Sequence, residues 1–162
     1  MHYYTMIDSP IDPLLLVGDG EQLTGLYMDA EVNFEKIAAE GKEDAKVFRT
    51  AIEQLRAYFA GELRHFDLPT RAQGTAFQQR VWQALSEIPY GVTVSYKHIA
   101  ERIGAPKAVR AVGLANGQNP ISIIVPCHRV IGANGKLTGY GGGLPRKQWL
   151  LGHEASQGVL GI

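Results

Sequence analysis

The sequence predicts an α/β protein in two parts: an N-terminal unit of strands with one packed helix, and a mainly helical C-terminal unit with a helix-turn-helix. Three observations support this fold class. Short aliphatic and aromatic runs separated by turn residues occupy the beginning of the chain, helical periodicity dominates the second half, and residues 68–74 have no hydrophobic period. We therefore expect one domain at 1–73 and a second at 74–162, with a linker at about 68–74.

Strands open the N-terminal unit. Turns that contain Pro and Gly separate three apolar runs, at 3–7, 14–17 and 23–28, which is typical of an antiparallel meander. One helix is expected after them, because apolar residues recur at helical spacing from Asp44 to Ala60 and Gly61 ends the pattern. The predicted unit is a small sheet with this helix packed on it.

Helices open the C-terminal unit. Thr75 and Gln78 have the spacing of a capping box and begin a helix that Pro89 stops. Ser95 can cap a second helix, which runs to about Ile103. Two helices are therefore expected in the first part of this unit.

A third helix, from near Pro106 to Gly117, forms a helix-turn-helix with the second, because only a short turn joins them. Its side chains are small, and few of them could read base edges. A slender helix suits close approach to a DNA groove or backbone with little sequence preference, although tight packing against neighbouring helices would explain the same composition. The residues concerned are the small Ala111 and Gly113 and the positively charged Lys107 and Arg110.

The end of the chain combines shorter elements with a last helix. The apolar run 121–125 ends at Pro126 and is expected to be a buried strand. Asn134-Gly135 predicts a hairpin turn. Pro145 favours the start of a helix that contains Glu154.

Charge is divided unequally between the two parts, although the net charge of the chain is zero. Residues 1–73 contain 7 Lys and Arg against 13 Asp and Glu, whereas residues 74–162 contain 9 against 3. The parts therefore carry about −6 and +6 at neutral pH, which favours contact between the C-terminal part and a polyanion. Chance asymmetry would produce the same totals.

Membrane, metal and disulfide functions receive no support from the sequence. No stretch reaches the roughly 18 apolar residues of a membrane span, and the segment from Met1 to Ser9 lacks the basic flank and apolar run of an export signal. A cytoplasmic location is therefore expected. The chain has 1 cysteine, which excludes an internal disulfide and a cysteine-rich zinc site, so no metal is predicted.

Cys127 is the candidate reactive residue. His128 and Arg129 follow it directly, and a nearby imidazole or guanidinium lowers the pKa of a thiol and raises its thiolate fraction. Without these neighbours a lone cysteine is more often a small buried apolar residue. Adjacent residues of an extended segment point to opposite faces, so His128 would reach the sulfur through a turn or a bridging water.

The motif Pro126-Cys127-His128-Arg129-Val130 resembles the acceptor site of the O6-alkylguanine-DNA alkyltransferases, also called methylated-DNA-protein-cysteine methyltransferases. The resemblance covers residues 75–154 and, more loosely, the N-terminal unit. It implies a ribonuclease-H-like α/β domain followed by a mainly helical, winged-helix-like domain. Further motifs in matching order carry it: Phe77-Gln78 to Trp82, Ile88-Pro89-Tyr90-Gly91, Ser95-Tyr96, Ala111-Val112-Gly113, Asn119-Pro120 and Tyr140-Gly141-Gly142-Gly143.

The resemblance implies roles around Cys127, which would be the alkyl acceptor. His128, through a water, and Glu154 would form the relay that makes the thiolate, whereas residue type alone would make Glu154 a solvated carboxylate on a terminal helix. Asn119 would hold the turn beside the acceptor segment by hydrogen bonds. Tyr96 would donate a hydrogen bond to guanine N3 and partly displace the backbone phosphate, although a tyrosine in the first turn of a helix usually serves only packing.

The same resemblance implies how DNA and the damaged base are bound. Arg110 would be the arginine finger that replaces the flipped nucleotide in the stack, whereas residue type alone would make it a phosphate contact. Tyr140 and the backbone of Gly141 would cover the base pocket; some family members have serine at this glycine, which leaves the width of the pocket open. The other residues assigned to the substrate are Val130 and Lys147, and those assigned to DNA are Lys107, Ala111, Gly113 and Tyr96.

The implied function is direct-reversal DNA repair. The thiolate attacks the alkyl carbon, guanine leaves as its O6 anion, and Cys127 keeps the alkyl group, so each molecule acts once and without a cofactor. The partner is double-stranded DNA containing O6-alkylguanine, whose damaged nucleotide must be flipped out of the duplex. The protein is expected to act as a monomer. Activity on O4-alkylthymine and cooperative binding along DNA stay open.

Two other functions fit parts of the sequence. A non-catalytic module that flips alkylated bases and marks them for another repair pathway would lack the acceptor cysteine, which is present here. A Cys-His hydrolase or acyltransferase would turn over an ester or amide and would need an oxyanion hole. The gain of an alkyl group on Cys127 from alkylated DNA distinguishes the first function from both.

Overall fold

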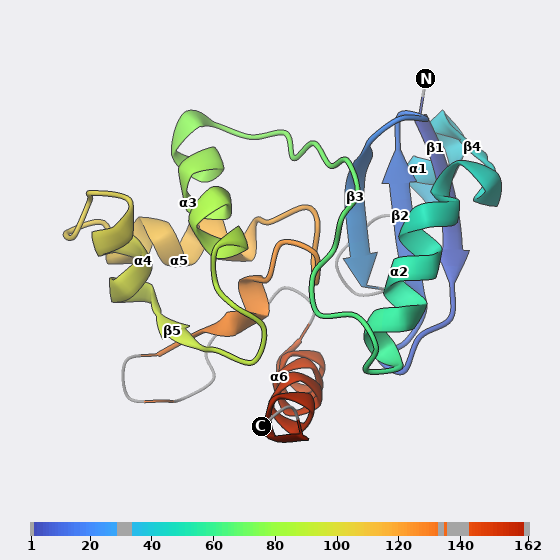
Figure 1. The fold of residues 1–162 in the computed structure, drawn as a ribbon. Helices are drawn as coiled ribbons and strands as arrows, with labels where there is room; N and C mark the ends of the chain where they lie inside the picture. The colour runs from blue at the N-terminus through green and yellow to red at the C-terminus, as the bar shows by residue number, and fades with distance from the viewer. Residues whose placement is uncertain (1, 29–33, 133–134, 136–142, 161–162) are drawn as a thin grey trace.

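The structure is a computed structural model that describes residues 2–28, 34–132, 135 and 143–160. A sheet-containing N-terminal part and a mainly helical C-terminal part lie side by side, and the last helix lies below their junction (Figure 1). The α/β fold class expected from the sequence is thus confirmed.

A sheet with the strand order β3-β2-β1-β4 forms the N-terminal part. The three predicted strands are present as an antiparallel meander: β1 (His2–Ile7), β2 (Leu14–Gly18) and β3 (Leu23–Met28). A short strand, β4 (Gly41–Glu43), follows the helix α1 (Phe34–Glu40) and pairs in parallel with β1. Neither was predicted, because elements this short do not establish a hydrophobic period.

The predicted helix packed on this sheet is present, but its first turn differs. It begins as a 3₁₀ helix, η2 (Ala45–Phe48), and continues as α2 (Arg49–Phe59). The Asp44 side chain accepts a hydrogen bond from the backbone N–H of Lys46 at 3.0 Å, and such an Asx turn favours a tight first turn. Leu55 and Tyr58 on this helix are each 0% exposed.

The segment 68–74 crosses from one part to the other (Figure 1). Its path follows the edge of β3, because the N–H of Leu23 donates to the carbonyl of Pro69 and the N–H of Arg71 donates to the carbonyl of Leu23, both at 2.9 Å. The predicted linker is therefore tied to the sheet. The division into domains at this segment stays a prediction.

Both predicted N-caps of the C-terminal part are confirmed. At the start of α3 (Ala76–Ser86), Thr75 Oγ1 accepts from the N–H of Gln78 at 3.1 Å, and Gln78 Oε1 accepts from the N–H of Thr75 at 2.8 Å. At the start of α4 (Tyr96–Arg102), Ser95 Oγ accepts from the N–H of His98 at 3.0 Å.

The third helix, α5 (Val109–Gly117), begins later than predicted. Pro106 lies in a turn that the N–H of Ala108 closes by donating to the carbonyl of Ala105 at 2.9 Å. The fixed φ of proline suits the second position of a turn as well as the first turn of a helix. Lys107 therefore precedes the helix, whereas Arg110, Ala111 and Gly113 are within it.

The prediction of a strand at 121–125 was wrong. Ile121 forms an isolated bridge with Leu26, and the chain then turns: the N–H of Val125 donates to the carbonyl of Ile121 at 3.0 Å, and Ile123 has a φ of 72°. The run is largely buried, as expected. An apolar run without a period does not distinguish a strand from a compact buried turn.

Four elements complete the described fold. The 3₁₀ helix η3 (Cys127–Arg129) leads into β6 (Val130–Ile131), which pairs in parallel with β5 (Val94–Ser95), and α6 (Leu144–Leu160) is the predicted last helix. The predicted turn at Asn134-Gly135 lies partly outside the described residues. Within the described ranges, none of the helices has the length and hydropathy needed to cross a membrane.

Candidate active site

Cys127 is the first residue of η3 and is only 4% exposed. Its N–H donates to the carbonyl of Val125 at 2.8 Å, and its carbonyl accepts from Asn116 Nδ2 at 3.4 Å. The segment is therefore helical, not extended as expected from the sequence. His128 and Arg129 follow within one tight turn.

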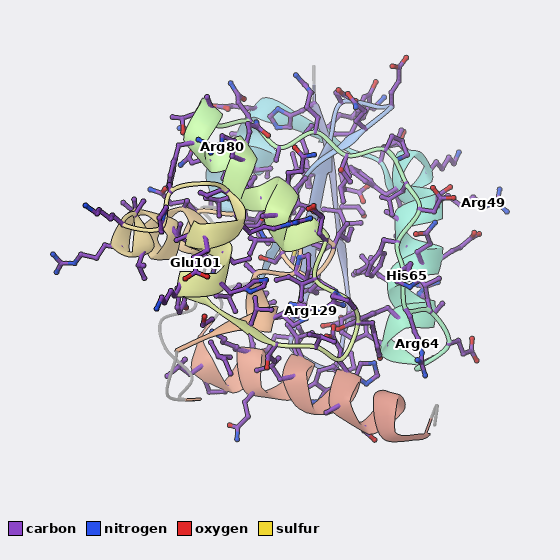
Figure 2. All side chains as sticks on the ribbon, turned by 60° about the vertical axis from the view of Figure 1, so that its left-hand side comes forward. Arg49, Arg64, His65, Arg80, Glu101 and Arg129 are labelled. Atoms are coloured by element: carbon purple, nitrogen blue, oxygen red, sulfur yellow. The ribbon has the colours of Figure 1, made fainter. Side chains whose placement is uncertain are left out.

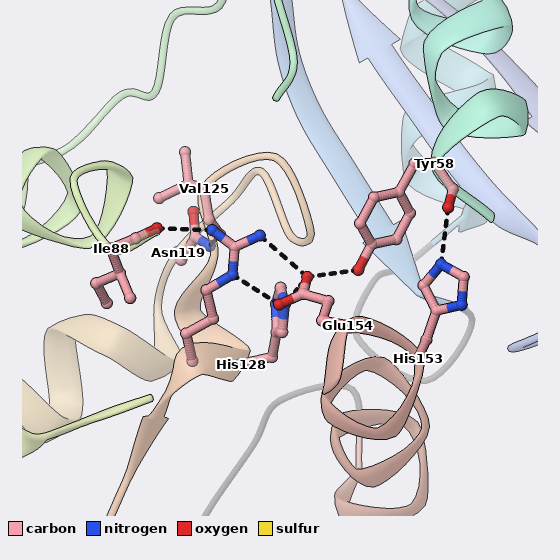
Figure 3. A network of polar contacts seen from close by, with 8 residues as sticks. Tyr58, Ile88, Asn119, Val125, His128, His153 and Glu154 are labelled. Carbon is pink, nitrogen blue, oxygen red and sulfur yellow. Dashed lines mark hydrogen bonds and ion pairs between the residues drawn. The ribbon is translucent and has the colours of Figure 1, made fainter. Parts of the chain in front are cut away.

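Glu154 on α6 is the centre of a buried network (Figure 3). Its Oε2 accepts hydrogen bonds from His128 Nε2 at 2.8 Å, from the Tyr58 hydroxyl at 2.6 Å and from Arg129 Nη2 at 3.0 Å. Its Oε1 accepts from Arg129 Nε at 2.8 Å. With an exposure of 1%, Glu154 is not the solvated carboxylate that its residue type alone would suggest.

The ionisation of this network follows from burial and hydrogen bonds. Burial favours the neutral acid, but the bonds from His128 and then from Arg129 outweigh it and hold the pKa of Glu154 well below its usual range. Burial lowers the pKa of His128 more than Glu154 raises it. The pair at neutral pH is therefore a neutral imidazole and a carboxylate.

A neutral imidazole that donates through Nε2 presents Nδ1 as a proton acceptor. Nδ1 of His128 is buried and has no hydrogen-bond partner among the described residues. Since buried polar atoms rarely stay unpaired, a water or a proton donor is expected to meet it.

The guanidinium group of Arg129 has a structural role. Besides its two bonds to Glu154, its Nη1 donates to the carbonyl of Ile88 at 2.7 Å, and the residue is 7% exposed. Figure 2 shows it inside the molecule, whereas Arg49 extends outwards from α2. The sequence offered this guanidinium as a charge beside the thiol, but Glu154 neutralises it.

Lys147 on α6 supplies a second buried cation. It is 0% exposed, and its Nζ donates to the carbonyl of Val130 at 2.7 Å. Burial lowers the pKa of Lys147, whereas its electrostatic interaction with Cys127 raises it. This interaction between the ammonium group and Cys127 favours a thiolate.

Asn119 holds the turn that precedes Cys127. Its Oδ1 accepts from the N–H of Ile121 at 3.0 Å, and its Nδ2 donates to the carbonyl of Val125 at 2.8 Å. Both bonds join Asn119 to the turn at 121–125. They replace strand pairing in a segment that is otherwise apolar.

A second group of assigned residues lies on and before α5. Arg110, Ala111 and Lys107 are exposed. Gly113 lies next to Tyr96, because a Cβ atom at this glycine would be in ordinary van der Waals contact with the tyrosine ring at 3.8 Å. Tyr140 and Gly141 lie outside the described residues. The structure thus gathers His128, Glu154, Asn119, Val130 and Lys147 around the acceptor segment, and Tyr96 beside α5.

Sequence reasoning did not include Tyr58 in the site. Its position on the apolar face of a predicted helix marked it as a packing residue. A buried tyrosine hydroxyl needs a hydrogen-bond partner, and this signal could have singled it out without naming Glu154. In the part of the chain that the structure describes, no cluster of three or more His, Cys, Asp or Glu side chains could hold a metal ion.

Comparison with known protein families shows which family contains this chain. Residues 76–156 match the model described as 6-O-methylguanine DNA methyltransferase, DNA binding domain, and residues 2–72 match 6-O-methylguanine DNA methyltransferase, ribonuclease-like domain. The chain belongs to the 6-O-methylguanine DNA methyltransferase family. The relationship expected from the motif around Cys127 is thereby confirmed.

Individual relatives agree over nearly the whole chain. The methylated-DNA–protein-cysteine methyltransferase of Mycobacterium tuberculosis is 59% identical over 157 residues, which are 97% of this chain and 94% of the relative. The protein of the same name from Methanosarcina acetivorans is 56% identical over 156 residues, 95% of this chain and 99% of the relative.

Solved structures show the same fold. The crystal structure of M. tuberculosis O6-methylguanine methyltransferase matches with a TM-score of 0.91 and 58% identity, over 97% of this chain and 94% of that chain. A crystal structure of the M. tuberculosis protein in complex with DNA matches with a TM-score of 0.90 and 58% identity, over 96% and 94%.

Proposed function

We propose that this protein repairs DNA by direct reversal, with Cys127 taking the alkyl group from O6-alkylguanine in double-stranded DNA and keeping it. The activity is proposed because the chain belongs to the 6-O-methylguanine DNA methyltransferase family. One observation supports Cys127 as the acceptor. It is the 1 cysteine of the chain and lies at the start of η3, directly before the buried imidazole of His128, which is bonded to the ionised carboxylate of Glu154.

The network supports a route for the thiol proton. It leaves Cys127 for Nδ1 of His128, through a water as the family resemblance implies, and Glu154 stabilises the imidazolium that forms. Lys147 stabilises the thiolate. The sulfur then bonds to the alkyl carbon while the carbon–O6 bond breaks, and the electron pair leaves with guanine O6. Tyr96 and the backbone of Gly141 serve as hydrogen-bond donors to the guanine anion.

DNA is bound by the positively charged C-terminal part. Lys107 is exposed just before α5 and Arg110 is exposed in its first turn, and the solved complex of the M. tuberculosis relative with DNA supports DNA binding. Arg110 fills the place of the flipped nucleotide, and Ala111 and Gly113 keep the helix slender enough to approach the groove. Tyr140, Gly141 and Val130 enclose the base.

The remaining assignments follow from this chemistry. Residues 1–73 form the acidic N-terminal domain and residues 74–162 the domain that contacts DNA. The protein acts as a monomer, because all the relay residues come from one chain, and in the cytoplasm, where reducing conditions preserve a thiol. No cofactor is needed, since the substrate's own carbon–oxygen bond supplies the alkyl group.

The test is stoichiometric alkyl transfer measured by intact-protein mass. The protein is incubated with a duplex that contains O6-methylguanine, with the same duplex containing guanine, and with one containing O4-methylthymine. One methyl group on Cys127 from the first duplex, none from the second and none in Cys127→Ala supports the proposal. An unmodified protein at stoichiometric O6-methylguanine DNA would overturn it, and repeated turnover of an aryl ester would favour the hydrolase instead.

A further inference from the structure

Tyr58 reaches the acceptor site from the N-terminal part. It lies on α2, is 0% exposed, and donates its hydroxyl to Glu154 Oε2 at 2.6 Å (Figure 3). The two residues are 96 positions apart in the sequence. A side chain of the ribonuclease-like part thus bonds directly to the carboxylate of the relay.

The tyrosine is fixed on several sides. Its ring centroid lies 5.3 Å from that of Phe59, 5.4 Å from Phe66 and 5.2 Å from His153. His153 Nε2 also lies 2.7 Å from the carbonyl oxygen of Tyr58. Since His153 and Glu154 are consecutive, α6 is bonded to this one tyrosine at two adjacent residues.

The hydroxyl and His128 share one oxygen atom. Glu154 Oε2 receives both the 2.6 Å bond from Tyr58 and the 2.8 Å bond from His128, whereas Arg129 bridges both oxygens. Burial and the adjacent carboxylate raise the pKa of Tyr58, so it stays a donor at every working pH. Without this donor, Oε2 would keep its bonds from His128 and Arg129 but lose the hydroxyl bond that holds it from the side of α2, so the carboxylate could shift relative to His128.

We propose that Tyr58 is a positioning residue of the relay: its hydroxyl holds Glu154 Oε2 at His128, so that the N-terminal part sets the thiolate fraction of Cys127. This inference deepens the proposed function and rests on the relay assigned there. Among the described residues, the charged and titratable groups involved are His128 and Lys147 beside Cys127, and Tyr58, Tyr90, His128 and Arg129 around Glu154.

The variant Tyr58→Phe removes one oxygen and keeps the ring contacts. The thiol pKa is measured from the pH dependence of alkylation by iodoacetamide in protein without DNA. We expect the thiol pKa to rise by about one unit, which is a roughly tenfold loss of thiolate at neutral pH, with rates that converge at high pH. Methyl transfer from O6-methylguanine DNA should slow by the same factor.

Tyr90→Phe is the matched control. Its ring lies 6.2 Å from that of Tyr58, but its hydroxyl has no hydrogen-bond partner among the described residues. This variant loses the same atom and should keep the wild-type thiol pKa. An equal shift in Tyr90→Phe would overturn the proposal, as would an unchanged or lowered thiol pKa in Tyr58→Phe.

A double-mutant cycle tests whether Tyr58 acts through Glu154. In a Glu154→Gln background, Tyr58→Phe should cause no further shift of the thiol pKa; an additive shift would contradict the positioning role. His153→Ala removes the bond to the Tyr58 carbonyl and should also raise the thiol pKa, by less than Tyr58→Phe does. It replaces Tyr58→Phe as the test variant if Tyr58→Phe does not fold. Because iodoacetamide needs no DNA, failure of wild-type methyl transfer would count against the proposed function alone.

Discussion

Nε2 of His128 lies 2.8 Å from Oε2 of Glu154, where η3 meets α6. Both side chains are buried, with exposures of 0% and 1%. The bond fixes which ring nitrogen of His128 accepts a proton, and it also joins the last helix to the acceptor segment. The proposed chemistry and the packing of α6 therefore depend on the same pair, and variants must be chosen to separate the two effects.

Glu154→Ala should be strongly destabilising. It leaves the guanidinium of Arg129 buried without a counter-charge, which costs about 3–5 kcal/mol of unfolding free energy. Urea denaturation measures this loss. Glu101→Gln is the control, because Glu101 is exposed and lies 4.0 Å from Lys97 in a surface pair, so its loss should cost less than about 1 kcal/mol. Equal stability of the two variants would show that the buried pair contributes little.

Stability should fall on acidification. The pKa of Glu154 is lowered from an ordinary 4.5, so its ionised form stabilises the fold above that pH and the contribution is lost as pH falls further. The pKa of His128 is lowered from 6.5 by burial, so its contribution is complete above that value and lost below it.

The urea concentration at the unfolding midpoint should therefore decline in two steps as the pH is lowered from neutral. The first step, due to His128, lies below pH 6.5, and the second, due to Glu154, lies below pH 4.5. Glu154→Gln should lose the second step, because its side chain does not titrate. A wild-type midpoint that rises on acidification would contradict both directions of shift.

Asn119→Ala should destabilise the turn before Cys127. The substitution leaves the N–H of Ile121 and the carbonyl of Val125 without their partner in a buried segment, at a cost of about 3 kcal/mol. Thermal unfolding measures it, and methyl transfer should slow because Cys127 follows this turn. Gln118→Ala is the control: its side chain is exposed and bonds only to the side chain of Gln78 among the described contacts, so both properties should stay near wild type.

Local sequence signals predicted the elements that depend on near neighbours. The caps at Thr75 and Ser95 were correct because capping needs only residues three positions apart. The apolar run 121–125 was misread as a strand because its conformation depends on bonds from Asn119 and on a bridge to Leu26 in the sheet. A buried turn and a buried strand use the same apolar residues.

The site could be predicted only where its residues are adjacent. Cys127 and His128 are neighbours in the sequence, whereas the link from His128 to Glu154 came from family resemblance and not from residue type. Tyr58 bonds to a residue 96 positions away, and no periodic or local pattern reports such a contact. Its place on a helical face indicated packing, which is true of its ring and not of its hydroxyl.

Lys147→Met should lower the reactivity of Cys127 without unfolding the protein. Loss of the nearby ammonium raises the thiol pKa, so iodoacetamide alkylation at neutral pH should slow several-fold. Stability should fall by about 1 kcal/mol, because the Val130 carbonyl loses a donor while methionine still fills the space. Arg146→Met is the control on the same helix, since Arg146 pairs with Asp12 of the N-terminal part at 2.9 Å. Equal alkylation rates in both variants would remove Lys147 from the site.

Arg110→Ala should slow methyl transfer from duplex DNA at least about tenfold, because flipping a nucleotide costs a few kcal/mol that an inserted side chain offsets. Transfer from the free base O6-benzylguanine should keep its wild-type rate, since a free base needs no flipping. Lys107→Ala provides the contrast: loss of one phosphate contact should weaken binding and reduce the salt slope by about one, with an unchanged rate at saturating DNA. Equal slowing of both substrates by Arg110→Ala would place Arg110 in the chemical step and not in the base stack.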